Sequence, residues 1–321
     1  MKTLPVKVFA LLTAWVCLWS QIQAAEMTFM PQWLPQAQFA GFYLAADKGY
    51  FAEEGLDIRF LHLTENNSED TTRAAESGRA DIVGCLLENA VEARERGLRL
   101  VNIMQVLQQG SGLACVSRKP LRTAEDLNGM RIAWWKSLNL VYPLVIRRER
   151  APETEWIEAV NGNNLFIYKA VDAVLVYTYS ELPRLRLSMG DIPPENILDF
   201  AADGWNIPGD GIYVTETFYA AHKDELQAFV RAAKRGWAYA RKHPEEALDA
   251  TERYRREAHL ATNRMFQRMM LVEYLRLQVN PATQRADFAP PTREQFEQCV
   301  RVLQRMGLLQ TQVRYEEVFR P

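Results

Sequence analysis

The sequence is poor in the residues that form disulfides and zinc sites. It has four cysteines in 321 residues, and Cys17 lies in an N-terminal segment with the pattern of an export signal. Three cysteines then remain in the rest of the chain, at positions 85, 115 and 299. An odd number of widely spaced cysteines argues against a disulfide framework and against a zinc site. Cys85 and Cys115 either pair in an oxidising compartment or lie buried as small apolar side chains on two strands.

The sequence also lacks the motifs of common catalytic centres. The four histidines, at positions 62, 222, 243 and 259, do not have the spacing of a metal site. It contains neither a G-x-S-x-G elbow nor a cysteine–histidine pairing typical of a nucleophile. We therefore predict a protein that is not an enzyme and that uses no cofactor or metal.

Neither sign of charge dominates. Lys and Arg number 38 and Asp and Glu number 40, which gives a formal net charge of −2 at pH 7. A protein that binds nucleic acid usually carries a basic patch or stripe, and this composition offers none. We therefore expect no nucleic-acid partner.

The chain has one long apolar run, and it lies at the N-terminus. Residues 8–19 (VFALLTAWVCLW) follow Lys2 and Lys7 and precede the small pair Ala24-Ala25. This arrangement is typical of a cleaved signal peptide, and the run is too short to span a bilayer comfortably. Val16 stands before Cys17 where a lipoprotein signal needs a small residue. We expect residues 1–25 to be removed and the mature protein to be periplasmic and unlipidated.

The stretch 32–54 has the strongest local pattern. A Trp33-Leu34-Pro35 turn precedes apolar residues spaced three and four apart, which predict one helix from about 38 to 53. Gly55 then ends the helix, and LDIRFLHL alternates as a strand does. Strand, helix and strand in one run predict a βαβ unit, which places Trp33 at the carboxyl edge of a sheet.

The rest of the chain continues this alternation. Residues 80–87 read as a buried strand, and the segment ENAVEARERG after it reads as a short helix. Strands over 130–135, 154–160 and 171–179 alternate with helices over 138–150 and 163–170, which predicts a parallel sheet with crossover helices. From Thr217 the pattern is helical, with helices predicted over 224–242, 258–277 and 292–306. We expect an α/β protein with two lobes.

The opening stretch resembles the periplasmic solute-binding proteins for thiamine-pyrimidine precursors, a family that also includes a fungal enzyme that builds the pyrimidine. The matching positions are Trp33, Gln38, Gly41-Phe42-Tyr43, Ala45, Gly49-Tyr50-Phe51 and Gly55-Leu56-Asp57. The resemblance implies a type II periplasmic-binding-protein fold, with two crossover strands joining lobe one (26–116 and 216–321) to lobe two (117–215). The fungal enzyme needs a cysteine-rich motif and a lysine–histidine pair, and this chain has neither.

The resemblance also implies partners. A periplasmic binding protein delivers its ligand to the membrane permease of an ABC importer, and similar domains act as ligand sensors for membrane signalling proteins. We expect a monomer that serves one of these two partners. A binder of a sulfonate, taurine or nitrate in the same fold is the alternative to a pyrimidine binder, although the acidic segment 64–69 argues against an anion.

Three aromatic-rich edges mark the expected cleft: residues 33–43, 177–181 and 204–210. Members of the family stack the pyrimidine between a Trp and a Tyr and anchor it with a Glu one turn after the Tyr, which implies Trp33, Tyr177 and Glu181 here, with Tyr179 as a substitute for Tyr177. The predicted ligand-binding residues are Trp33, Gln38, Tyr43, Tyr177, Tyr179, Glu181, Trp205 and Asp210. Trp33 and Tyr177 could instead pack the surface between the lobes, and Glu181 could be a solvated helix start. For Trp134-Trp135, a ligand or lid role and a place in the core of lobe two both stay open.

Overall fold

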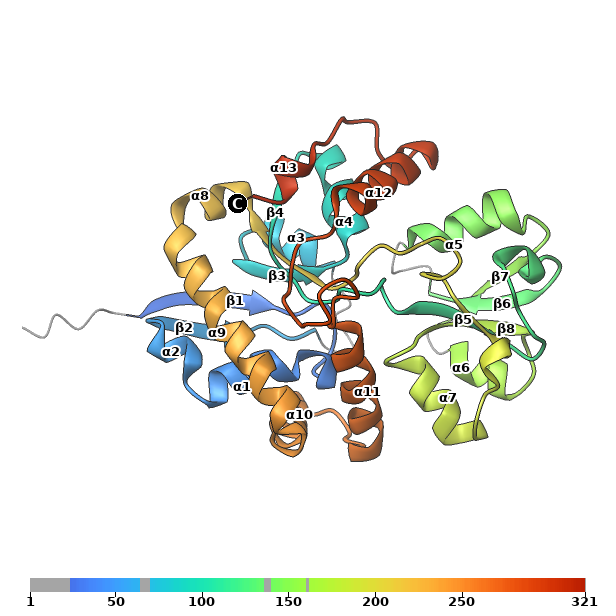
Figure 1. The fold of residues 1–321 in the computed structure, drawn as a ribbon, viewed down its shortest axis with the longest axis horizontal. Coiled ribbons are helices and arrows are strands. Elements are labelled where there is room, and N and C mark those ends of the chain that lie inside the picture. The colour runs from blue at the N-terminus through green and yellow to red at the C-terminus, as the bar shows by residue number, and fades with distance from the viewer. Residues whose placement is uncertain (1–23, 64–69, 136–139, 160–161, 321) are drawn as a thin grey trace, which may run out of the picture.

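Two α/β lobes lie side by side in the computed structural model, which describes residues 24–63, 70–135, 140–159 and 162–320 (Figure 1). The chain forms the first part of lobe one, crosses to lobe two, and returns to complete lobe one. Residues 1–23 of the predicted signal peptide and the acidic segment 64–69 lie outside the described residues.

The first pass through lobe one alternates strands and helices, as the sequence predicts. Its elements are β1 (Ala25–Met30), α1 (Ala40–Asp47), α2 (Tyr50–Glu53), β2 (Leu56–Phe60), α3 (Thr71–Glu76), β3 (Ile82–Cys85), α4 (Leu87–Glu92) and β4 (Leu100–Gln105). The single helix predicted over 38–53 is divided in two, because Gly49 adopts a left-handed φ of 72° between α1 and α2. Only glycine adopts this conformation without a steric cost, so a glycine inside an apolar periodicity marks the break.

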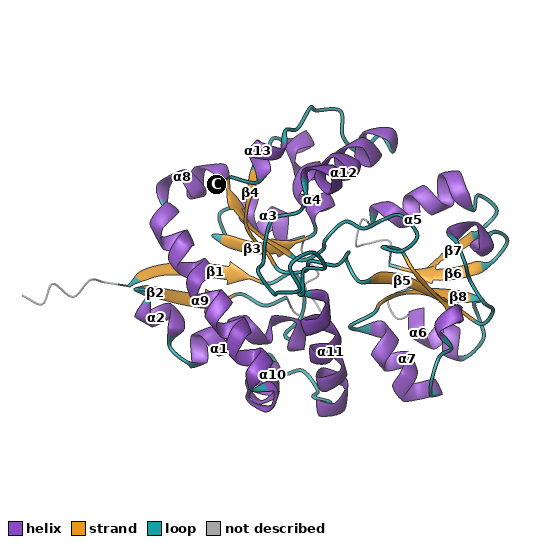
Figure 2. Ribbon diagram, in the orientation of Figure 1, coloured by secondary structure: helices purple, strands orange, loops and turns teal. Residues whose placement is uncertain are grey.

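Lobe two is a second alternating unit. Its elements are β5 (Leu113–Ser117), β6 (Arg131–Trp134), α5 (Val141–Val145), β7 (Glu155–Glu158), α6 (Gly162–Ile167), β8 (Ala173–Tyr177), α7 (Glu181–Met189) and β9 (Ile197–Asp199). A one-turn π-helix (Ile146–Arg150) extends α5. Figure 2 shows α5 on one side of this sheet and α6 and α7 on the other. Alternate residues of β8 pack toward each side, with Leu175 facing α5 and Val174 and Val176 facing α6 and α7.

The return segment completes lobe one and is helical after its first strand. Its elements are β10 (Gly211–Thr215), α8 (Glu216–Ala221), α9 (Lys223–Lys242), α10 (Pro244–Glu257), α11 (Arg264–Leu277), α12 (Arg293–Arg305) and α13 (Tyr315–Val318). The sequence did not predict α10, because Pro244 reads as a helix stop. Here it ends α9 and also occupies the first turn of α10, where its missing N–H costs nothing.

The two sheets have the same size and a related strand order. Sheet one runs β2-β1-β3-β10-β4, and sheet two runs β7-β6-β8-β5-β9. In sheet one β1 is parallel to β2 and β3, whereas β10 lies antiparallel between β3 and β4. Because β5 belongs to sheet two and β10 to sheet one, a boundary drawn by sheet membership falls before Leu113 and before Gly211, slightly earlier than the predicted boundaries.

Helix α1 packs on α9 at very close range, which fixes the segment that carries Gln38. A Cβ atom on Gly41 would lie 2.1 Å from the ring of Trp237, and one on Gly236 would lie 2.0 Å from the carbonyl oxygen of Gly41. No side chain fits at either position without moving the backbone. The motif glycine at position 41 therefore serves helix packing in lobe one.

Candidate functional site

A buried polar cluster lies where the return segment meets lobe one. Asp210 is 4% exposed and stands directly before β10, with a left-handed φ of 56°. Its Oδ2 accepts hydrogen bonds from Gln38 Nε2 (2.6 Å) and from the Tyr274 hydroxyl (2.7 Å), and its Oδ1 accepts one from Gln32 Nε2. Burial raises the pKa of the Asp210 carboxyl, and its three donors oppose that rise. Asp210 thus has a donor on each oxygen and ties β10 to the segment after β1.

The same cluster reaches lobe two through a tyrosine. Gln38 Nε2 also donates to the Tyr179 hydroxyl at 3.3 Å, and the Tyr179 ring meets the Tyr274 ring edge to face at 5.2 Å. Tyr179 follows β8, so this contact joins the end of a lobe-two strand to lobe one. The structure therefore brings together three of the predicted site residues: Gln38, Tyr179 and Asp210.

Glu181 opens helix α7 and folds back over the end of β8. Its Oε2 accepts a hydrogen bond from the Tyr177 backbone N–H, and its Oε1 accepts one from the Ser180 hydroxyl, both at 3.1 Å. Burial raises the pKa of this carboxyl, and the Tyr177 N–H opposes the rise. Glu181 is half-buried beside Tyr177 rather than extended into solvent.

The aromatic side chains at the ends of β6 and β8 are stacked. The Trp135 and Tyr177 rings are nearly parallel, at 15°, with centroids 6.1 Å apart. Trp134 points the other way into the core and meets Trp156 edge to face at 5.4 Å. Trp134 therefore lies in the core, and a ligand or lid role for Trp135, which lies beside Tyr177, stays a prediction.

Trp33 is 39% exposed in the turn after β1. Among the ring pairs of the described residues, none joins Trp33 to Tyr177, which stacks on Trp135 instead. The role of Trp33 as a stacking face for a ligand stays a prediction.

Tyr43 and Trp205 lie away from the Asp210 cluster. Tyr43 is on the face of α1 that turns to α10, where its ring stacks on Tyr254 at 4.1 Å. Trp205 is 2% exposed and stacks on Tyr142 at 5.5 Å. Both aromatic side chains pack against other rings of the protein, which the residue pattern alone does not reveal.

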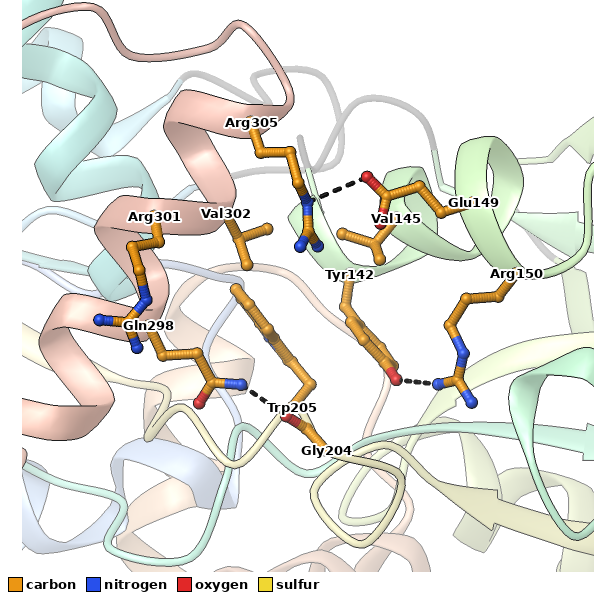
Figure 3. A pocket seen from close by; sticks show the side chains of 10 residues that line it. All are labelled: Tyr142, Val145, Glu149, Arg150, Gly204, Trp205, Gln298, Arg301, Val302 and Arg305. Carbon is orange, nitrogen blue, oxygen red and sulfur yellow. Dashed lines mark hydrogen bonds and ion pairs between the residues drawn. The ribbon is translucent and has the colours of Figure 1, made fainter.

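Trp205 forms one wall of a hollow of about 340 Å³ between α5 of lobe two and α12 of lobe one (Figure 3). Three arginines line it, and each has an acidic partner. Arg305 pairs with Glu149 at 3.0 Å, Arg301 with Glu297 at 3.6 Å, and Arg150 with Glu125 and Asp203. The hollow therefore has no uncompensated positive charge to attract an anion.

Glu88 is a buried acid that is not among the predicted ligand-binding residues. It lies in the first turn of α4, just after β3, and it is 3% exposed. No other residue that the structure describes forms a hydrogen bond or ion pair with its side chain. Burial raises the pKa of this carboxyl to about 7. The available signal was a glutamate directly after the apolar run IVGCLL, at the carboxyl end of a buried strand.

Three carboxyls act on Tyr177 from different parts of the chain. Burial raises the pKa of the Tyr177 hydroxyl, and the charges of Asp210, Glu88 and Glu181 raise it further. Lobe one, the return segment and lobe two thus each contribute one acid whose charge acts on this hydroxyl. Across the described ranges, no group of three or more His, Cys, Asp or Glu side chains is arranged to hold a metal ion.

The three cysteines of the described residues are free thiols. Cys85 on β3, Cys115 on β5 and Cys299 on α12 are all buried, and the described part of the chain contains no disulfide. Of the two open alternatives, the structure shows buried small side chains on two strands rather than a pair.

Residues 36–247 match the family model described as NMT1/THI5 like. Two relatives match along most of their length. The chain is 25% identical to the riboflavin-binding protein RibY of Chloroflexus aurantiacus, covering 92% of this chain and 84% of that protein. It is 24% identical to the formylaminopyrimidine-binding protein of Halalkalibacterium halodurans, covering 90% and 88%.

The fold is also found among solved structures. The periplasmic aliphatic sulphonate binding protein SsuA of Escherichia coli superposes with a TM-score of 0.64 at 14% identity, over 90% of this chain and 95% of that one. Similarity at this identity concerns the fold alone. The predicted α/β fold, that of type II periplasmic binding proteins, is confirmed.

Proposed function

Because this chain belongs to the NMT1/THI5-like family, we propose that it is a periplasmic solute-binding protein that captures a small planar heterocycle between its two lobes. The favoured ligand is an aminopyrimidine related to the precursors of thiamine. The protein binds this ligand without changing it and delivers it, as a monomer, to the permease of an ABC importer. Its signal peptide is removed near residue 25.

The observation that carries this proposal is the set of side chains at the carboxyl ends of β1, β3, β6 and β8. Trp135 and Tyr177 offer flat faces, while Glu181 and Glu88 offer carboxylate oxygens from opposite lobes. Ligand sites in open α/β folds lie at such strand ends. A flat heterocycle with N–H groups needs faces for stacking and a few placed acceptors.

The names of the two relatives support a heterocyclic ligand, but the two named ligands differ in size. One relative binds riboflavin and the other formylaminopyrimidine. Both ligands are planar rings with nitrogen in the ring. An aminopyrimidine presents more N–H donors for its size, and it therefore suits a site rich in carboxylates.

A sulfonate or nitrate binder is the second candidate. It rests on the shared fold, since sulphonate binding proteins have the same architecture. Against it, the charges of three carboxyls act on Tyr177, and a bound anion beside this ring would be repelled by each of them.

Calorimetry on the purified mature protein tests the proposal. The panel contains 4-amino-5-hydroxymethyl-2-methylpyrimidine, formylaminopyrimidine, riboflavin and taurine. We expect the aminopyrimidines to bind most tightly and mass analysis to recover them unchanged. A charge-assisted hydrogen bond contributes roughly 1.5–3 kcal/mol, so Glu181→Gln should weaken binding about ten- to a hundredfold. Trp33→Ala should cost at least as much, because it removes a stacking face and part of the wall.

Tyr168→Ala is the matched control, because Tyr168 is an aromatic side chain on lobe two that is 80% exposed. It should bind like the parent. If taurine alone binds, or if Trp33→Ala and Glu181→Gln retain the parental affinity for every heterocycle, the proposed site is wrong. If mass analysis finds one equivalent of a new product per protein, the protein is an enzyme and the proposed binding function is wrong.

A further inference from the structure

Glu88 is buried and has few hydrogen-bond donors. Its residue is 3% exposed, and only its own backbone N–H, among the described residues, bonds to its side chain. Asp210 and Glu181 each accept hydrogen bonds from at least two donors. A buried carboxyl with so few donors is costly in a folded protein unless it is protonated or meets a ligand. Glu88 therefore has the free acceptors that a ligand with N–H groups would use.

Glu88 lies in the first turn of α4, three residues after the carboxyl end of β3. Its charge acts on titratable groups of its own helix, of the neighbouring strands, of the return segment, of α12 and of lobe two. They are Glu92, Cys85, Tyr213, Asp210, Cys299 and Tyr177. All of them are acids, thiols or phenols, and no described cation is among them. Its charge therefore acts on residues of both lobes, as expected for a side chain at the cleft.

We propose that Glu88 is the lobe-one contact for the ligand, and that the cleft takes an amino-substituted heterocycle in its unphosphorylated form. This inference rests on the proposed function and specifies its ligand. Glu181 approaches the ligand from lobe two and Glu88 from lobe one, so a ring with N–H donors at two edges satisfies both when the lobes close. A phosphate or sulfonate on the ring would lie in the field of three carboxyls.

The proposal carries a pH dependence. Ligand N–H groups donate to the ionised form of Glu88, and burial places the pKa of this carboxyl at about 7. Between pH 6 and pH 8 the ionised fraction then rises about tenfold, and the apparent affinity rises with it. A glutamine at position 88 has the same shape and no such titration. Because the ligand titrates equally with either protein, the difference between them isolates Glu88.

The test compares three proteins by calorimetry: the parent, Glu88→Gln and Glu92→Gln. Glu92 is the matched control, since it is an acid one turn further along α4 whose pKa is also raised by burial. The probes are 4-amino-5-hydroxymethyl-2-methylpyrimidine and its phosphate, each at pH 6 and pH 8. Thermal unfolding of each variant shows whether it is folded.

We expect the parent to bind the unphosphorylated probe more tightly at pH 8 than at pH 6, by up to about tenfold relative to Glu88→Gln. Glu88→Gln should bind it about ten- to a hundredfold more weakly at pH 8. Glu92→Gln should stay within about twofold of the parent, and the phosphate should bind the parent at least about tenfold more weakly.

Each failure has its own meaning. If the parent binds the unphosphorylated probe and a folded Glu88→Gln binds it equally well at both pH values, the role of Glu88 is wrong and the proposed function stands. If the phosphate binds the parent as tightly as the unphosphorylated probe, the exclusion of anions is wrong. If the parent binds no heterocycle at all, the proposed function falls, and the inference falls with it.

Discussion

Two buried carboxyls of lobe one act on Tyr177, Asp210 from the return segment and Glu88 from α4. They differ in their hydrogen bonds. Asp210 accepts hydrogen bonds from Gln32, Gln38 and Tyr274, while no other described residue bonds to the side chain of Glu88. Both are almost fully buried. The donors of Asp210 come from two other elements, so its carboxyl stabilises the connection between them, whereas Glu88 keeps acceptor capacity for another molecule. For these two acids burial is the same and hydrogen bonding differs.

Removing the Asp210 carboxyl should have the largest effect. Asp210→Ala removes the acceptor of the Gln32, Gln38 and Tyr274 side chains and places alanine at a left-handed φ. We expect the free energy of unfolding to fall by about 3–5 kcal/mol, measured by urea denaturation. Asp210→Asn is the control, because asparagine tolerates this φ and keeps one acceptor oxygen, so it should lose about half as much. Equal stability of Asp210→Ala and the parent would contradict the structural role of this carboxyl.

Removing the Glu88 charge should have a smaller effect of opposite sign. The pKa of Glu88 is raised from 4.5 to about 7 in the folded protein. Between these pH values the folded state binds more protons than the unfolded state, so the free energy of unfolding of the parent falls as pH rises. By pH 8 that loss is nearly complete, and Glu88→Gln should be more stable than the parent by about 3 kcal/mol.

Below pH 4.5 the parent and Glu88→Gln should be equally stable, because Glu88 is then protonated in both the folded and the unfolded state. Thermal unfolding at pH 4, 6 and 8 measures the trend. A Glu88→Gln protein that is less stable than the parent at pH 8 would mean that Glu88 has a structural partner and is not free for a ligand.

The smallest effect belongs to the contact between the lobes. Tyr179→Phe removes the 3.3 Å hydrogen bond from Gln38 and keeps the ring packed on Tyr274. Gln38 retains its bond to Asp210. We expect a loss of about 0.5–1 kcal/mol in the free energy of unfolding, and little change in affinity for the aminopyrimidine. A larger loss than that of Asp210→Asn would show that the contact to lobe two, rather than Asp210, holds the cluster together.

Much of the fold could be predicted, because it depends on periodicity. The alternation over residues 130–179 predicts β6, α5, β7, α6 and β8 in order. Two errors come from residues that act on the backbone. Gly49 divides an apolar periodicity that continues on both sides of it, and Pro244 begins a helix although it also ends one. Periodicity reports which face is apolar, and it does not report where the backbone turns.

The candidate site could be predicted in part. Strand ends bring Tyr177, Tyr179 and Glu181 to the expected edge, and Gln38 and Asp210 meet there through a hydrogen bond. Tyr43 and Trp205 are instead covered by other rings, and only the packed structure provides those partners. Glu88 could not be distinguished from a solvated acid, because the cost of burial depends on what the fold places around it.

The placement of β10 determines which of the two sheets can be completed first during synthesis. This strand lies between β3 and β4, so sheet one is divided until residue 215 has left the ribosome. Every strand of sheet two, from Leu113 to Asp199, is made earlier. A growing chain therefore contains every strand of its second lobe while its first lobe still lacks the strand that joins β3 to β4. If the chain folds during synthesis, lobe two is therefore the first lobe that can be completed, although the first strands of lobe one are made before it.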